Sequence, residues 1–325
     1  MPALRRQFLL AALAAAYAAS PLPSFAQAYP AKPVSIVVPF PPGGATDILA
    51  RMLGQKLSES LKQPFLVDNK AGATGAIGLN FVARAPADGY TLILATASSL
   101  GTNPAVSKVP FDPVKDFTPV GLLAAEPLGL AVHPSVPANS VQELIALAKS
   151  KPGALNMASF GNGSVSHLAG ELFSSMAGIK MTHVPYKGAA PATADLIAGQ
   201  VSLMFNSISV FVAPAKAGKL RMLATAGATR TPGLPDLPTV AESGVPGFDA
   251  ATWHAILGPA GMSPEIVSTL SREFGRALKL PDVQSKLAGM SLEPQAAEPA
   301  QLASTLARDV AKWKKIVAET GIKVD

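Results

Sequence analysis

The sequence predicts an α/β fold in two lobes that are joined by two crossing strands. Three observations lead to this prediction: short β-rich runs alternate with helical patterns from Val34 to about Gly227, the last third is helical, and two extended apolar segments adjoin turns rich in proline and glycine. The 325 residues are 49% hydrophobic and 15% charged, which is a globular composition with a length that suggests about two domains.

Eight short apolar runs are predicted to be strands. In chain order they are VSIVVPF, PFLVDN, YTLILAT, LGLAVHP, LNMASFG, MTHVPYK, VSLMFNS and LRMLATAG. Most are rich in β-branched or other apolar residues and end at glycine, proline or asparagine. Because helical patterns lie between them, the sheets are expected to be largely parallel.

Helices are predicted where apolar residues recur at spacings of three and four. One such stripe runs from Asp47 to about Leu61. Another helix opens at Ser140, where Ser140 and Glu143 form a capping-box pattern. The last third holds PEIVSTLSREFGRAL and PAQLASTLARDVAKWKKIVAETG, two amphipathic helices with no strand expected between them. Trp313 continues the apolar stripe of the second, so we expect it in the core.

Two extended segments are predicted to cross between the lobes. They are Val120–His133 and Phe248–Gly261. Two crossings put both ends of the chain in one lobe, so lobe 1 is expected to hold residues 27–124 plus 252–325, and lobe 2 residues 125–251. Ligand sites favour the cleft between such lobes.

A strand, a glycine turn and a helix start follow one another four times. The turns lie at residues 39–47 (PFPPGGATD), 69–78, 159–167 and 184–191, two in each predicted lobe. Gly43 and Gly44 carry no Cβ, so their amides can approach a ligand or a neighbouring backbone. A helix start offers unpaired N–H groups and a positive dipole end. The pattern predicts that several helix starts converge on one anion, while a turn that merely needs glycine is the alternative for any single one.

The sequence lacks the common motifs of catalysis, cofactor binding and metal binding. There is no cysteine, none of the four histidines is paired at a spacing of three or four, and there is no dinucleotide or phosphate loop and no G-x-S-x-G elbow. We therefore expect no cofactor and no metal, although a dispersed Ser/His/Asp triad stays open. The net charge of +6 is mild and not clustered, which argues against nucleic acid as a partner.

The first residues read as an export signal. MPALRRQFLLAALAAAYAASPLPSFAQA combines two arginines, an apolar run and the small-x-small site Ser24–Ala26. Residues 1–26 are expected to be a signal peptide that is cleaved after Ala26, which places the mature chain in the periplasm. Sec export is the default, and the two arginines leave twin-arginine export open.

Seven segments of the sequence resemble, in family order, the solute receptors of tripartite tricarboxylate transporters, the Bug-type periplasmic binding proteins. The segments are PFPPGGATD, AGATGAIG, VPFDPVKDFTPVG, GNGSVSHLAGELF, HVPYKGAAPATADLIAGQV, LPTVAESGVPGF and WHAILGPAG. The resemblance covers essentially the whole mature chain. It implies a type II, Venus-flytrap periplasmic binding fold, an organic carboxylate held by loops at helix starts, and delivery to an integral membrane permease. We expect a monomer and no enzymatic activity.

The resemblance also implies the residues that touch the ligand. In lobe 1 they are Phe40, Gly43, Gly44, Ala45, Thr46, Asp47, Ala73, Thr74, Ser98 and Ser99. In lobe 2 they are Ser159, Asn162, Gly163, Ser164, His167, Tyr186, Lys187 and Asn206. For four of them a structural role is the competing interpretation: Asp47 as a cap of its own helix, His167 as a packed or capping histidine, Tyr186 as a satisfied tyrosine and Lys187 as a solvated lysine.

The ligand and the use made of it stay open at this point. Tricarboxylates, dicarboxylates, amino acids such as glutamate and aromatic carboxylates are candidates, and Phe40 and Phe160 favour an apolar or aromatic body slightly. A periplasmic hydrolase and a receptor that presents the carboxylate to a signalling kinase are the alternative functions.

Overall fold

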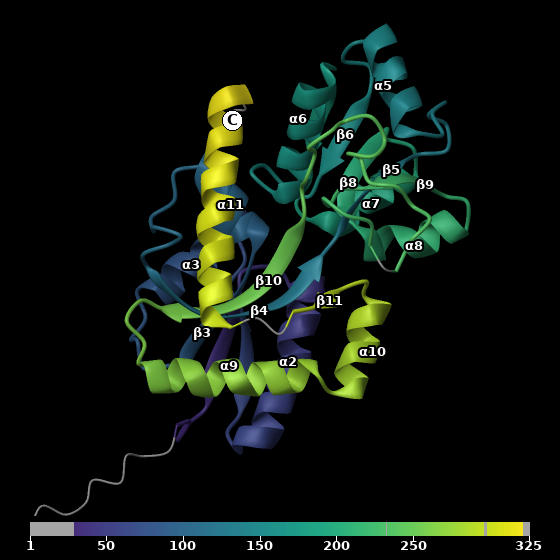
Figure 1. The fold of residues 1–325 in the computed structure, drawn as a ribbon. Helices are drawn as coiled ribbons and strands as arrows, with labels where there is room; N and C mark the ends of the chain where they lie inside the picture. Colours follow the sequence, from purple (N-terminus) through teal and green to yellow (C-terminus); the bar gives the residue numbers. More distant parts are fainter. Residues whose placement is uncertain (1–28, 232, 296–297, 321–325) are drawn as a thin grey trace, which may run out of the picture. The chain divides into compact units, whose positions relative to one another are not determined.

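The structure is a computed structural model that describes residues 29–231, 233–295 and 298–320 (Figure 1). The predicted signal peptide, residues 1–26, lies outside the described residues. The chain divides into a short N-terminal unit, Met1–Ala31, and a large unit, Lys32–Asp325. The described helices and strands all lie in the large unit.

The first of two sheets contains both predicted crossing strands. Its strand order, among the described residues, is β11 (Glu293–Pro294), β4 (Phe117–Glu126), β10 (Thr252–Pro259), β3 (Thr91–Thr96), β1 (Val34–Val38) and β2 (Phe65–Asn69). The strand β1 is parallel to β2 and β3, whereas β10 is antiparallel to β3 and β4. The helices α2 (Ala45–Leu61) and α3 (Ala76–Ala83) both follow strands of this sheet. The sheet is therefore parallel at one end and antiparallel where the chain crosses.

The second sheet is built in the same way. Its order is β7 (Thr182–Pro185), β6 (Asn156–Ser159), β8 (Leu203–Ser207), β5 (Leu128–Val132) and β9 (Arg221–Thr225). The strand β6 is parallel to β7 and β8, and β5 is antiparallel to β8 and β9. The helices that follow these strands or lie between them are α5 (Val141–Ser150), α6 (Val165–Ala177), α7 (Ala189–Ile197) and α8 (Ile208–Lys216).

The eight predicted strands all form. The amide of Glu143 donates to the Ser140 hydroxyl over 3.2 Å, so Ser140 caps α5 as predicted. The helices α9 (Pro264–Leu278) and α11 (Pro299–Thr320) are also confirmed. The expectation that no strand separates them was wrong, because α10 (Pro281–Gly289) and the two-residue strand β11 lie between. Two residues are too few for a periodic pattern, and β11 forms because Glu293 and Pro294 pair with β4.

The chain changes sheets at two neighbouring places. On the way out, β4 in the first sheet and β5 in the second are separated by Pro127 alone. On the way back, the amide of Ala250 donates to Ala226 beside β9, while Thr252 already pairs with Glu126 of β4. Figure 1 shows β4 and β10 side by side, with β4 running toward the second sheet and β10 running back from it. The strands β5 and β10 lie inside the two predicted crossing segments, and β4 begins at Phe117, three residues before the first segment. The predicted lobe boundaries stay a prediction.

The C-terminal helix α11 packs on the cores of both sheets. Leu302, Leu306 and Val310 lie in a cluster with residues of β3 and β10, whereas Trp313 lies in the cluster around β5, β6 and α6. The same helix holds the returning crossing segment from two sides. The Trp253 indole donates to Asp309 over 2.6 Å, and the Lys312 ammonium donates to the Asp249 carbonyl over 2.7 Å. Trp313 is 1% exposed, so its predicted core position is confirmed.

Replacement of Trp313 tests how much this packing stabilises the fold. Trp313→Ala removes a fully buried indole and leaves a cavity, so we expect the free energy of unfolding to fall by about 3–5 kcal/mol. Lys315→Ala, on the exposed side of the same helix, should change it by less than about 0.5 kcal/mol. Chemical denaturation of both variants measures the difference. A loss below about 1 kcal/mol for Trp313→Ala would show that α11 is not part of the folded core.

Candidate ligand-binding site

Segments that follow strands of both sheets meet at one place. These are η1 (Ala73–Gly75), the π-helical turn η2 (Ala97–Thr102), α4 (Asn103–Val106) and the glycine loop at 159–167. The Thr74 hydroxyl donates to the Asn162 carbonyl over 3.0 Å, and the Thr102 hydroxyl donates to the Gly163 carbonyl over 2.7 Å. Side-chain hydroxyls from the first-sheet side therefore bind the backbone of a second-sheet loop directly.

The glycine loop at 184–191 joins the same cluster. The amide of Tyr186 donates to the Ser159 carbonyl over 3.0 Å. The Tyr186 hydroxyl donates to Asp195 over 2.7 Å, and burial, with this carboxylate, raises the pKa of Tyr186 to about 12. This favours the interpretation of Tyr186 as a satisfied tyrosine. Lys187 is exposed.

The loop at 39–47 leads into α2, which begins at Ala45, two residues earlier than predicted. Gly43 has a φ of +87°, a conformation that favours glycine, whereas Gly44 has an ordinary extended conformation with a φ of −80°. The alternative of a turn that merely needs glycine therefore fits Gly43 and does not fit Gly44. A Cβ placed on Gly44 would meet nothing within 4 Å, so there is open space in front of this helix start.

The carboxylate of Asp47 lies in this loop and is used by the protein itself. It accepts hydrogen bonds from the Gly43 amide over 3.0 Å, from Arg51 over 2.9 and 3.0 Å, and from Asn69 over 3.0 Å. Burial by itself raises the pKa of Asp47, but these hydrogen bonds and the Arg51 charge outweigh it and hold the pKa below its usual value. The capping interpretation of Asp47 is supported, and its oxygens are not left for a ligand.

The first amides of α2 differ from the rest of this loop. The N–H groups of Ala45, Thr46 and Asp47 have no preceding turn of helix to donate to, and within the described part of the chain they donate to no other acceptor. The Thr46 hydroxyl lies 3.5 Å from the ring of His254 in β10, which ties this helix start to the crossing strand. Three backbone donors thus remain for an anion.

The loop at 159–167 offers less than the sequence suggested. Helix α6 begins at Val165 with Ser164 as its cap. The amide of Gly161 donates to Ser159, that of Gly163 to the His167 ring, and that of Ser164 to the Gly161 carbonyl, at 3.2–3.3 Å. The amides of Gly161, Gly163 and Ser164 therefore have acceptors within the loop, and the contacts of this loop with a ligand stay a prediction.

Other predicted contact residues also have internal partners. Ser99 is fully buried and forms a reciprocal cap with Thr96, and Asn206 bonds Thr193 and the Ser207 amide. Ser98 accepts from the Val165 amide over 3.2 Å. The carbonyl of Phe40 accepts from Asn69, and Ala73 is exposed. Their contacts with a ligand stay a prediction, which is weakest for Ser99 and Asn206.

The predicted site residues did not include Asn103 or His254, and they reached Thr102 only as the end of the contact loop at residues 98–102. Asn103 donates to the Ala73 carbonyl over 3.0 Å, so it fixes η1 to α4. The only sequence signal for Thr102 and Asn103 is their place after the strand that ends at Thr96. His254 lies in a predicted crossing strand, where packing was the simpler interpretation.

Two histidines stack beneath the second-sheet loop, of which His167 is buried and His183 is half-buried. The rings of His167 and His183 are 3.8 Å apart, and His183 lies 2.7 Å from the Ser159 hydroxyl. Burial lowers the pKa of His167 to about 4, with a contribution from His183, and burial lowers the pKa of His183 to about 4. His167 Nε2 is 3.8 Å from Glu171, whose own pKa burial raises. Both imidazoles are therefore neutral near pH 7.

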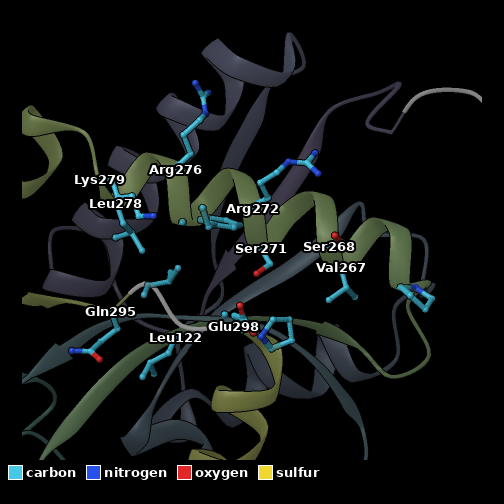
Figure 2. Close-up of a pocket in the computed structure, with 16 residues that line it drawn as sticks. Leu122, Val267, Ser268, Ser271, Arg272, Arg276, Leu278, Lys279, Gln295 and Glu298 are labelled. Carbon is cyan, nitrogen blue, oxygen red and sulfur yellow. The ribbon is translucent and has the colours of Figure 1, made fainter.

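The clearest cavity lies elsewhere. It has a volume of about 710 Å³ and lies between α9, β4 and the start of α11 (Figure 2). Figure 2 shows Ser271, Val267 and Leu278 on the cavity side of α9, with Arg272 and Arg276 pointing away. None of the predicted contact residues lines it.

Among the described residues, no group of three His, Cys, Asp or Glu side chains could hold a metal ion, and no helix is long and apolar enough to cross a membrane.

The histidine pair makes stability depend on pH. Between about pH 6.5 and about pH 4 the unfolded chain takes up protons on these histidines and the folded chain does not, so the free energy of unfolding should fall as the pH is lowered through that range. His183→Gln should flatten this dependence, while the opposite contribution of Glu171 is present in both proteins. Denaturant titrations at several pH values measure both slopes. Equal slopes would show that His183 is not held neutral by the fold.

Comparison with known proteins identifies the family. The chain matches the model of the tripartite tricarboxylate transporter family receptor over residues 49–322. Protein BugT of Bordetella pertussis is 37% identical over 305 residues, which cover 93% of each chain. The structure of Rpa4515 from R. palustris with adipate is similar at a TM-score of 0.84 and 39% identity, covering 91% of this chain and 99% of that one. The structure of MatC (Rpa3494) from Rhodopseudomonas palustris with bound malate is similar at a TM-score of 0.81 and 33% identity. The match covers 89% of this chain and 100% of that one.

These similarities extend over the two sheets and the crossings between them. They confirm the predicted two-lobe α/β fold of periplasmic binding proteins, and the family they identify is one of receptors. The chain belongs to the tripartite tricarboxylate transporter receptor family, as a Bug-type periplasmic receptor.

Proposed function

We propose that this protein binds a small organic dicarboxylate between its two lobes in the periplasm and delivers it to the membrane components of a tripartite tricarboxylate-type transporter. One observation carries the proposal: the start of α2 presents three unpaired backbone amides behind a glycine turn, with open space at Gly44. Such a helix start attracts a carboxylate through its N–H groups and its dipole.

The number of donors fits the strength of binding that a receptor needs. Micromolar affinity corresponds to about 8 kcal/mol. A hydrogen bond to a charged group contributes about 1.5–3 kcal/mol, so on the order of five or six bonds suffice after ordering costs. The amides of Ala45, Thr46 and Asp47 supply three. Other predicted contacts supply the rest, such as the Ser98 hydroxyl, which accepts from the Val165 amide and keeps its own proton to donate.

The ligand class follows from the relatives and from the site. Rpa4515 is described with adipate and MatC with malate, both aliphatic dicarboxylates. The slight preference for an aromatic body rested on Phe40 and Phe160. Phe160 is partly buried against the apolar cores of the second sheet, so it is accounted for without a ligand. A dicarboxylate with one carboxylate at the start of α2 is the simplest ligand that the observations support.

The alternative functions are less well supported. A hydrolase needs an accessible nucleophile beside a base. Among the described residues, two serine hydroxyls lie 2.7 Å from a histidine ring. Ser159, beside His183, is fully buried and its hydroxyl also donates to the Gly161 carbonyl. Ser135, beside His133, lies in an exposed turn, outside the loops that meet at the candidate site. A receptor for a signalling kinase would use the same ligand site and differ in its partner.

We propose that the mature chain is monomeric and starts after Ala26.

Three variants separate backbone binding from binding by a basic side chain. Gly44→Val fills the open space before α2 without straining the backbone, so we expect a folded protein whose affinity for adipate or malate falls more than about tenfold. Lys187→Ala should change affinity less than about twofold, since it removes one exposed charge. Gly233→Val, another exposed glycine with open space at its Cβ, is the matched control. Calorimetry on folded variants decides between the two modes.

The opposite pattern would contradict the proposal. If Lys187→Ala abolishes binding while Gly44→Val is tolerated, the carboxylate is held by an ion pair. If wild-type protein binds neither dicarboxylate, the ligand class is wrong.

A further inference from the structure

Thr102 makes the shortest of the hydrogen bonds between the two sides of the candidate site. Its side chain is fully buried, and its hydroxyl lies 2.7 Å from the Gly163 carbonyl and 3.1 Å from the Ser98 carbonyl. The hydroxyl proton is thus shared between two carbonyls. Ser98 lies one turn before Thr102 in η2, whereas Gly163 is 61 residues away, in the loop that follows β6 of the second sheet.

Two further hydrogen bonds join the same segments. The Thr74 hydroxyl donates to the Asn162 carbonyl over 3.0 Å, and the Val165 amide donates to the Ser98 hydroxyl over 3.2 Å. We call Thr74, Ser98 and Thr102, with the backbone of residues 162–165, the interlobe latch. Three hydroxyls from the first-sheet side therefore fix one stretch of second-sheet backbone.

The two sides of the latch differ in their backbone conformation. On the first-sheet side, Thr96 and Ser99 cap η2 reciprocally, and Asn103 bonds the Ala73 carbonyl. On the other side, the loop contains Gly161 with a φ of +143° and Gly163 with a φ of +72°. A Cβ on Gly163 would lie 3.0 Å from Val106 and 3.1 Å from Asn103. The loop approaches η2 closely because Gly163 has no Cβ. Its own hydrogen bonds, among them those of Gly161 to Ser159 and of Gly163 to His167, shape the loop, and the latch fixes the loop to η2.

We propose that Thr102 is a positioning residue for ligand binding, whose hydroxyl holds the loop 161–167 against η2 so that both sides of the site are in place for the carboxylate. This rests on the proposed function, since it assumes that the ligand lies between these loops. Thr102 does not itself touch the ligand. It raises the fraction of molecules in the binding arrangement, and the apparent affinity scales with that fraction.

The hydroxyl can be removed or retained by single substitutions. Thr102→Val removes the donor and keeps the branched shape, while Thr102→Ser keeps the donor. Thr118→Val is the matched control, because the Thr118 hydroxyl donates to the Pro259 carbonyl over 2.9 Å between two strands of the first sheet. Affinity for adipate and malate is measured by calorimetry, and amide hydrogen exchange of residues 161–167 is measured without ligand.

The expected results differ among the variants. Thr102→Val should weaken affinity by about three- to tenfold and speed amide exchange in residues 161–167, since one interlobe hydrogen bond is lost. Thr102→Ser should restore both toward wild type. Thr118→Val should leave affinity and exchange in this loop unchanged, even if it lowers global stability.

Several outcomes would overturn the proposal. They are unchanged exchange and affinity in Thr102→Val, tighter binding in that variant, or the same loss in Thr118→Val. If Thr102→Val does not fold, Ser98→Ala is the second variant, and unchanged exchange at Val165 and its neighbours would then count against the latch. If wild-type protein binds neither dicarboxylate, the proposed ligand class fails, and the exchange data still decide whether Thr102 positions the loop.

Discussion

The antiparallel pairing of β4 with β10 is the constraint on which the rest of the structure depends. It places the outgoing and returning crossings side by side, with Glu126 opposite Thr252. The strand β10 also pairs with β3, which leads directly into η2. His254 in β10 contacts Thr46 at the start of α2, and Trp253 bonds Asp309 of α11. One strand thus connects the crossing, the helix start and the C-terminal helix, so the loops that form the site are held relative to one another by the sheet.

Local features of the fold could be predicted from the sequence, and contacts between distant segments could not. Strands such as β1 and β8 were predicted because each is a short apolar run in the sequence. Helix α2 was predicted because its apolar residues recur at spacings of three and four. The start of α2 was placed at Asp47 instead of Ala45, since the carboxylate that suggested a cap acts from inside the first turn on Gly43. The strand β11 was missed because only its pairing with β4 defines it.

The same distinction holds for the candidate site. The glycine turns were identified because glycine before a helix is a local signal. Whether their amides are unpaired depends on side chains such as His167 and Ser159, whose orientation no local pattern specifies. Thr102 was predicted only as the end of the contact loop at residues 98–102, because a buried threonine after a strand is ordinary, and its hydrogen bond to Gly163 appears only in the fold. The family resemblance implied both Ser99 and Thr46 as ligand contacts. In the structure, Ser99 is bonded internally to Thr96, whereas the Thr46 amide has no acceptor among the described residues, so Thr46 is the better candidate.

The two sides of the site therefore have different roles. The start of α2 supplies unpaired donors beside a carboxylate, Asp47, that the protein satisfies internally, and the second-sheet loop is held by the latch. Titration of isotope-labelled protein with adipate or malate, followed by amide resonances, tests this most directly. The amide resonances of Ala45, Thr46 and Asp47 should shift together and saturate with the ligand. Saturable binding that leaves these three resonances unmoved would contradict the role of the α2 start as the carboxylate site.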